Sequence, residues 1–161
     1  MSFTAIDDGF GLILQIIYLL GCNNIMNLKP SFVLIGKQLK ALPDLLREHN
    51  LPSGLFPRNI TCYEFDESKS KLIVYFPSPC EVSFKDASMV RYATRVKATL
   101  SRGKLSGIEG MKTKVLVWVK VTGVSVDSYK SDKVLFMAGV KKSRAKDAYE
   151  LPRDAVKVEE F

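Results

Sequence analysis

Apolar and polar residues alternate along most of the chain between residues 59 and 140, and this period of two predicts β-strands. The clearest stretch is 114–126, KVLVWVKVTGVSV, which we predict to be a single strand with one valine face. We expect the rest of the fold to be organised around this strand. Its valine face comprises Val115, Val117, Val119 and Val121, and its opposite face comprises Leu116, Trp118, Lys120 and Thr122.

The same alternation predicts five further strands, at 59–65, 71–76, 80–85, 90–101 and 133–140. The stretch 90–101 is typical of a half-buried antiparallel strand, because its two faces differ in polarity. The polar run 66–70 predicts a hairpin turn, and 102–111, which contains three glycines, predicts a long hairpin loop. In 90–101 the inner face comprises Val90, Tyr92, Val96, Ala98 and Leu100, and the outer face Arg91, Arg95, Lys97 and Thr99.

A helical spacing of leucines precedes the strands. Pro43 suits the first turn of a helix better than its interior, so we predict a helix over residues 43–49. The segment 51–57, LPSGLFP, predicts a rigid turn that packs. These elements predict a mainly β, antiparallel domain with one short helix near its N-terminal side. The leucines on one side of the helical projection are Leu39, Leu42, Leu45 and Leu46.

Length and composition are those of one ordinary globular domain. A chain of 161 residues is long enough for one domain with a core and too short for two. Its 47% hydrophobic and 25% charged residues argue against disorder and against a polytopic membrane protein. The net charge of +7 arises after Leu39, because the preceding residues carry two lysines and two aspartates. We therefore divide the chain into an apolar leader (1–39), a β domain (40–140) and a basic charged tail (141–161), and we expect a monomer.

The leader contains an apolar run at residues 10–21, FGLILQIIYLLG, which is shorter than a helix that spans a bilayer. Asp7 and Asp8 stand where a signal peptide carries positive charge, and Cys22 begins a poor cleavage site. We favour a docking helix or a disordered tail over a degenerate export signal. A cytoplasmic location is correspondingly favoured over secretion.

The basic residues of the β domain raise the question of an anionic partner. Arg91, Arg95 and Lys97 would share an outer strand face. A base-stacking sheet needs more than one exposed aromatic residue, so we expect no specific nucleic-acid partner. The basic face instead predicts weak attraction to an anionic surface such as a membrane. If the strands 90–101 and 114–126 pair about the loop between them, Arg95 would lie over the ring of Trp118.

Residues with catalytic or metal-binding chemistry are few. His49 is the one histidine, and its place at the predicted helix end favours a capping role over a catalytic one. The sequence has no G-x-S-x-G motif and no CxxC spacing, so we predict no catalytic residue, no metal and no cofactor. Cys22, Cys62 and Cys80 form an odd set. Reduced thiols are favoured, with a Cys62–Cys80 bridge as the alternative.

Three stretches resemble a plant family of unknown function, number 538 in the domain-of-unknown-function series: LPDLLREHNLPSGLFP (42–57), YEFDESKSKLIVYFPSPCEV (63–82) and GKLSGIEGMKTKVLVWVKVTGV (103–124). The tail VKKSRAKDAYELPRDAV resembles the branch of that family without an evident signal peptide. Residues 1–39 show no family pattern, so a wrongly predicted first exon is a further alternative for the leader. The positions that match family motifs are Leu51, Pro52, Gly54, Leu55, Pro57, Cys80, Gly103, Leu105, Gly107, Gly110, Trp118 and Val121.

The resemblance implies an all-β, barrel-like domain likened to half of bactericidal/permeability-increasing protein, whose apolar cavity holds lipid. We therefore expect a single antiparallel β-barrel or a strongly curved sheet of about six to eight strands, with the short helix packed on it. The resemblance also implies binding or hydrolysis of chlorophyll-like pigments and a response to stress.

Surplus apolar residues on the second face of the strands predict a binding surface. Leu116, Trp118, Leu135 and Met137 oppose the main core face and need a cover, which a helix or a ligand would provide. We predict a non-enzymatic domain that binds a lipid or another amphiphile through these residues. The alternatives are a pigment or lipid ester hydrolase and a stress-related protein-interaction module.

Overall fold

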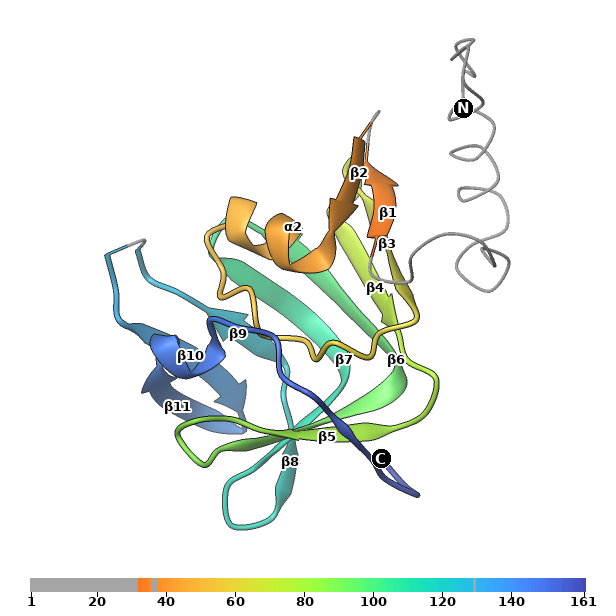
Figure 1. The fold of residues 1–161 in the computed structure, drawn as a ribbon. Helices are drawn as coiled ribbons and strands as arrows, with labels where there is room; N and C mark the ends of the chain where they lie inside the picture. Colours follow the sequence, from red (N-terminus) through yellow and green to blue (C-terminus); the bar gives the residue numbers. More distant parts are fainter. Residues whose placement is uncertain (1–31, 36–37, 129) are drawn as a thin grey trace, which may run out of the picture.

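The computed structural model describes residues 32–35, 38–128 and 130–161 (Figure 1). These residues form an antiparallel sheet of ten strands, a separate two-stranded sheet and one short α-helix. The two-stranded sheet pairs β1 (Phe32–Ile35) with β2 (Gln38–Ala41). The further elements are α2 (Leu42–Glu48), β3 (Cys62–Asp66), β4 (Lys71–Tyr75), β5 (Cys80–Ser83), β6 (Met89–Ser101), β7 (Lys104–Lys114), β8 (Trp118–Lys120), β9 (Gly123–Ser125), β10 (Lys133–Ala138), β11 (Val140–Ala145), the 3-10 helix η2 (Lys146–Tyr149) and β12 (Val156–Lys157).

The two longest strands, β6 and β7, form the centre of the large sheet. The strand order is β11-β10-β9-β7-β6-β4-β3, with β5 beside β6, β12 beside β5 and β8 beside β7. Two strands share one edge of β6, because β4 pairs with residues 95–99 and β5 pairs with residues 89–92. In the same way β9 pairs with the first part of β7 and β8 with its last part. The sheet therefore divides at both sides of its central hairpin.

The prediction of a mainly β, antiparallel fold with one short packed helix is confirmed for the described residues. The strands predicted at 59–65, 71–76, 80–85 and 90–101 are β3, β4, β5 and β6. The closed barrel and the count of six to eight strands are not confirmed. The ten-stranded sheet is open, with β3 and β11 at the two ends of its main path, and it curves around α2 (Figure 1). Short strands that each cover only part of a long neighbour raise the strand count without closing the sheet.

The prediction of a glycine-rich loop over residues 102–111 is wrong, because most of these residues lie in β7. The chain reverses within Arg102-Gly103, because Ser101 already pairs with Lys104. Gly110 has φ +93°, and a Cβ atom there would lie 2.5 Å from the backbone oxygen of Arg95. The β6–β7 register shifts between Tyr92 and Lys97, next to this close approach. These glycines therefore allow a bulged strand pairing.

The stretch 114–126 is not the single strand that we predicted. β7 ends at Lys114, residues 115–117 form a turn, and the short strands β8 and β9 follow. Val121 is buried as predicted, whereas Val117 is 68% exposed at the turn. Because residues 104–114 already form a central strand, the chain reverses at 115–117 and adds β8 to the free edge of β7.

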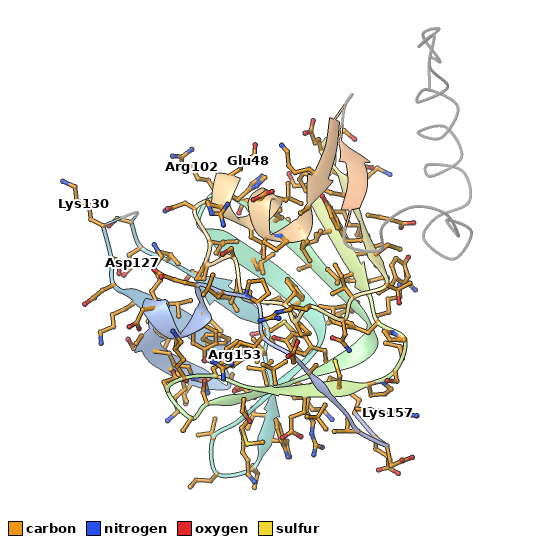
Figure 2. The ribbon with its side chains drawn as sticks, in the orientation of Figure 1. Glu48, Arg102, Asp127, Lys130, Arg153 and Lys157 are labelled. Carbon is orange, nitrogen blue, oxygen red and sulfur yellow. The ribbon has the colours of Figure 1, made fainter. Side chains whose placement is uncertain are left out.

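The space between α2 and the concave side of the sheet is filled by apolar side chains (Figure 2). α2 has Pro43 in its first turn and buries three leucines, so the predicted helix is confirmed with a shift of one residue at each end. The predicted rigid turn 51–57 is buried beside it. Aromatic rings pack at centroid distances of 4.2 to 5.8 Å in the pairs Phe56–Tyr92, Phe76–Tyr92, Phe84–Tyr149 and Phe136–Tyr149.

The segment predicted as a charged tail after residue 140 takes part in the sheet and in the core. β10 ends before Gly139, which turns the chain with φ +76°, and β11 pairs along the whole of β10. Ala148 and Tyr149 of η2 are buried. The backbone N–H of Gly54 donates to the carbonyl of Tyr149 at 2.7 Å. Apolar residues that close the core therefore lie beyond the predicted boundary at residue 140.

Residues 1–31 of the predicted leader lie outside the described residues. Among the cysteines, Cys62 is disulfide-bonded and Cys80 carries a free, buried thiol. The two are therefore not joined to each other, and the expectation of a reduced thiol holds for Cys80 alone of this pair. Within the described part of the chain, no helix has the length and apolar character needed to cross a membrane.

Candidate functional site

The most exposed large apolar side chain of the described residues, Leu116, lies at the tip of the hairpin formed by β7 and β8. Lys114 pairs with Trp118, so the connecting loop contains only three residues. The N–H of Val115 donates to the carbonyl of Val117 at 3.0 Å and keeps this loop tight. Leu116 is 91% exposed and Val117 is 68% exposed. The hairpin therefore presents an apolar tip in a defined conformation.

Trp118, at the base of this hairpin, is held between cationic side chains. The guanidinium carbon of Arg91 lies 4.2 Å from the centroid of the indole ring, and the Nζ atom of Lys114 lies 5.9 Å from it. Arg91 is fixed in turn, because its Nε donates to Glu81 at 3.0 Å. Each such contact contributes about 0.5 to 1 kcal/mol at a partly exposed site. The ring is thus oriented beside the apolar tip.

The arginine predicted to lie over Trp118 was the wrong one. Arg95 pairs with Tyr75 of β4, whereas Arg91, four residues earlier on the same face of β6, meets the ring. The physical reason is the position of β7, which lies between β6 and β8 and moves Trp118 towards the start of β6. Lys97 is opposite Ile73 and Glu109. Of the three predicted anion-binding residues, only Arg91 contacts a ring of the hairpin, from its place on the neighbouring strand β6.

Lysines lie on the two strands of the hairpin, below its apolar tip. Arg91, Lys112 and Lys120 are directly opposite one another on β6, β7 and β8. The Nζ of Lys112 donates to the carbonyl of Phe161 at 3.1 Å and lies 4.4 Å from the centroid of its ring. Lys114 and Lys120 are exposed. The strands that carry Leu116 and Val117 are therefore positively charged, and we call residues 112–120 the basic hairpin.

The other two predicted ligand-binding residues do not join this hairpin. Leu135 and Met137 lie on the outer face of β10 and are half-buried. Leu135 is opposite Ser125 and Ser143 across the two neighbouring strands. Met137 packs over Gly123, where a Cβ atom would lie 3.6 Å from its Cγ atom. The four predicted residues therefore lie on two separate parts of the sheet.

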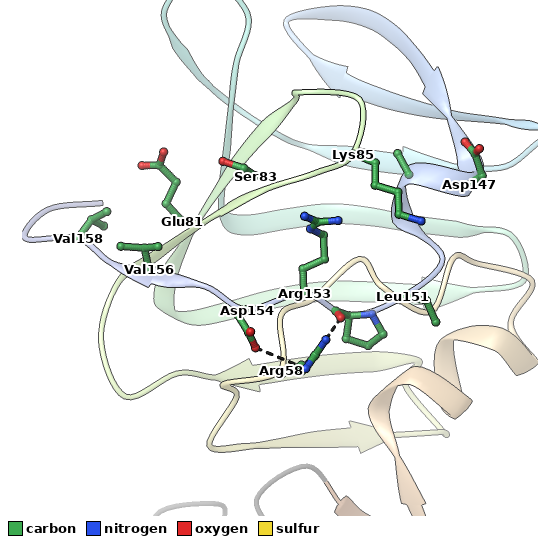
Figure 3. A pocket seen from close by; sticks show the side chains of 12 residues that line it. Arg58, Glu81, Ser83, Lys85, Asp147, Leu151, Arg153, Asp154, Val156 and Val158 are labelled. Carbon is green, nitrogen blue, oxygen red and sulfur yellow. Dashed lines mark hydrogen bonds and ion pairs between the residues drawn. The ribbon is translucent and has the colours of Figure 1, made fainter.

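A second surface feature is an open groove of about 600 Å³ between β5 and the C-terminal segment (Figure 3). Its walls come from β5 and the residues that follow it, from Arg58, and from residues 147–158. Arg153 and Lys85 both extend over the groove. Sequence reasoning missed this feature, because it assigned the C-terminal residues to a tail and gave them no place beside β5.

The imidazole of His49 and the thiol of Cys80 both occupy defined positions in the fold. His49 is the C-cap residue of α2, as predicted, and its Nδ1 lies 2.9 Å from the carbonyl of Leu45. Burial raises the pKa of the Cys80 thiol to about 11, so this thiol is protonated at neutral pH. In the described ranges, no three His, Cys, Asp or Glu side chains are grouped as a metal site.

Comparison with known proteins gives two findings. The family model described as "Protein of unknown function, DUF538" matches residues 42–150, from α2 through η2. A protein of Arabidopsis thaliana, described as "Uncharacterized protein At5g01610", is 52% identical over 126 residues, which are 78% of this chain and 72% of that protein. The family match includes the basic hairpin. It also extends past the predicted domain boundary at residue 140.

Proposed function

The chain belongs to the DUF538 family of proteins of unknown function, and for this member we propose a non-enzymatic role in binding the surface of an anionic lipid bilayer. The basic hairpin is the proposed contact. The observation that carries the proposal is the combination of an exposed apolar tip, Leu116 and Val117, with the lysines that flank it.

An interfacial contact needs both kinds of residue. Apolar tip residues leave water when they enter the boundary between head groups and acyl chains, and a buried leucine contributes about 1.5 to 3 kcal/mol. Lysines near an anionic surface contribute about 1 kcal/mol each, and their long side chains keep the charge at the head groups. Trp118 lies where an aromatic side chain is favoured, at the level between the two. Lys114 and Lys120 therefore supply attraction, and Leu116 supplies insertion.

A bilayer surface is a better candidate than a lipid held inside the fold. The concave side of the sheet is filled by α2 and by aromatic rings, including Phe136 and Tyr149. The exposed apolar residues available to a lipid are therefore outside the core, and the most exposed of them, Leu116, lies at the hairpin tip. Of the four residues predicted to contact an amphiphile, our proposal therefore keeps Leu116 and Trp118, and it adds Val117.

Cosedimentation with vesicles tests the apolar part of the proposal. We expect the protein to sediment with phosphatidylcholine vesicles that contain phosphatidylserine, and to remain in solution with phosphatidylcholine alone. Leu116→Glu removes the inserting side chain and adds a repelled charge, so we expect bound protein to fall by about tenfold or more. The matched control is Leu151→Glu, because Leu151 is also exposed, at 67%, but lies near the end of α2 beside Asn50.

The same assay tests the charged part. The double substitution Lys114→Glu and Lys120→Glu is expected to abolish sedimentation with phosphatidylserine vesicles, and added salt is expected to weaken binding of the unchanged protein. Lys71→Glu, an exposed lysine of β4, is the control and should have little effect. The proposal would be refuted if Leu151→Glu weakened vesicle binding as much as Leu116→Glu does. It would also be refuted if the unchanged protein bound equally to vesicles with and without phosphatidylserine.

A further inference from the structure

We propose that the groove between β5 and the C-terminal segment binds a small organic oxyanion, a carboxylate or a phosphate monoester attached to an apolar body. This site is separate from the basic hairpin, and the proposal does not rest on bilayer binding. It is argued from the charges that the groove leaves without a partner and from the apolar side chains beside them.

Three distant segments of the chain build the groove. β5 contributes its outward side chains, the turn before β3 contributes Arg58, and the segment after η2 crosses both. The C-terminal segment is fixed in place, because Val156 and Lys157 pair with β5 and the backbone N–H of Arg58 donates to the carbonyl of Arg153 at 3.1 Å. The volume of about 600 Å³ lies within the range of small-molecule sites.

Two of the acidic residues that line the groove already have basic partners. Glu81 accepts a hydrogen bond from Arg91 at 3.0 Å. Asp154 lies 3.7 Å from Arg58, whose Nε also donates to the carbonyl of Pro152 at 3.1 Å. These contacts hold Arg58 against the C-terminal segment and use its charge (Figure 3). The partnered residues therefore form a neutral frame for the groove.

Arg153 and Lys85 are the cations that remain. Neither side chain forms a salt bridge with any residue in the described part of the chain. Arg153 extends from the C-terminal segment and Lys85 from the residues after β5, and both reach over the groove from different walls (Figure 3). A bound oxyanion between these two walls would be attracted by both cations. The guanidinium group also supplies two parallel N–H donors that match a carboxylate or a phosphate.

Apolar residues on the same walls distinguish an organic anion from an inorganic one. Val156 is 71% exposed and Leu151 is 67% exposed, and both line the groove with Val158. They offer contact area to an apolar body next to the cationic end. Asp147 also lines the groove, and its negative charge partly offsets the positive charge of Arg153 and Lys85. Its charge favours a ligand with one anionic group over a polyanion such as nucleic acid.

Titrations followed by backbone amide chemical shifts test the proposal with three probes: phenyl phosphate, benzoate and inorganic phosphate. We expect saturable shifts at residues of β5 and of the segment 151–158, with phenyl phosphate or benzoate bound more tightly than inorganic phosphate. Arg153→Gln is expected to weaken binding of the organic probe by about fivefold or more, and adding Lys85→Gln should remove saturation. Asp147→Asn, which removes the opposing charge, is expected to tighten binding.

Lys71→Gln on β4 is the matched control, because it removes an exposed lysine outside the groove. All variants should keep the unfolding temperature of the unchanged protein, since each alters an exposed or half-exposed side chain. Shifts that do not saturate, or equal weakening by Lys71→Gln and Arg153→Gln, would overturn the site. Equal affinity for phenyl phosphate and inorganic phosphate would overturn the assignment of an organic ligand.

Discussion

At the scale of single residues, Tyr92 shows how this core combines apolar packing with hydrogen bonding. Its ring packs against Phe56 and Phe76 at centroid distances of 5.8 and 5.4 Å. Its hydroxyl group donates to the backbone carbonyl of Leu55, in the rigid turn that follows α2. Burial raises the pKa of Tyr92 well above its ordinary value, so the hydroxyl remains a donor over the whole neutral range. One side chain thus links β6 to the turn.

Tyr92→Phe tests this link. The change leaves the ring in place and removes the donor, so the buried carbonyl of Leu55 loses its partner. We expect the free energy of unfolding to fall by about 1 to 3 kcal/mol, measured by urea denaturation. Tyr75→Phe is the control, because its hydroxyl contacts Glu64 at 3.2 Å in a half-buried position; we expect a change within about 0.5 kcal/mol. Similar losses for both variants would contradict a specific role for the Tyr92 hydroxyl.

At the scale of elements, glycines determine how closely two backbones approach. A Cβ atom at Gly54 would lie 2.3 Å from the backbone oxygen of Leu151 and 2.6 Å from that of Tyr149. The rigid turn and the segment after η2 can therefore pack directly against each other. Gly107 has φ +58° and open space where a Cβ atom would be. Glycine is therefore favoured at position 107 by the left-handed backbone conformation and not by a close contact.

Gly54→Ala and Gly107→Ala form a matched pair of substitutions. At Gly107 we expect a loss of about 1 to 2 kcal/mol, because an alanine must adopt a left-handed conformation there. At Gly54 we expect a larger loss, of about 3 kcal/mol or more, because the new methyl group meets backbone atoms that belong to two residues. Thermal and urea unfolding measure both values. A smaller loss for Gly54→Ala than for Gly107→Ala would show that the C-terminal segment yields easily at this contact.

At the scale of the whole molecule, the C-terminal segment closes the core from the outside. Tyr149 is fully buried, its ring packs on Phe84 and Phe136, and its hydroxyl meets Ser88 and Arg144. The segment then crosses to β5, where β12 pairs. Elements from both ends of the described chain therefore share one core.

Removal of residues 146–161 tests this closure. We expect the free energy of unfolding to fall by about 4 kcal/mol or more, because the loss of Tyr149 alone is comparable to the removal of a large buried aromatic side chain. Removal of only residues 159–161 ends the contact of Phe161 with the half-buried Lys112 and leaves Tyr149 in place, so we expect a small change. Calorimetry distinguishes the two. A cooperative, unshifted transition after the longer deletion would contradict the closure.

Local pattern was sufficient where one face of an element is buried and its neighbours are adjacent in sequence. The alternation of 90–101 predicted β6 and its buried residues, such as Tyr92 and Val96, because burial on one face requires a period of two. The leucine spacing with Pro43 predicted α2. The motif residues of 42–57, 63–82 and 103–124 identified the family. These properties depend on local geometry and on inherited sequence, and both are present in the chain itself.

Tertiary structure decided the features that depend on which strands meet. An apolar run such as 115–117 is compatible with a buried strand and with an exposed tip, and only the reversal beside β7 places Leu116 in solvent. The choice of Arg91 over Arg95 at Trp118 depends on β7 lying between their strands. The groove of Arg153 and Lys85 exists because a charged segment pairs with β5, more than seventy residues earlier in the chain. Long-range pairing has no local signature, so the hairpin and the groove appear only in the folded protein.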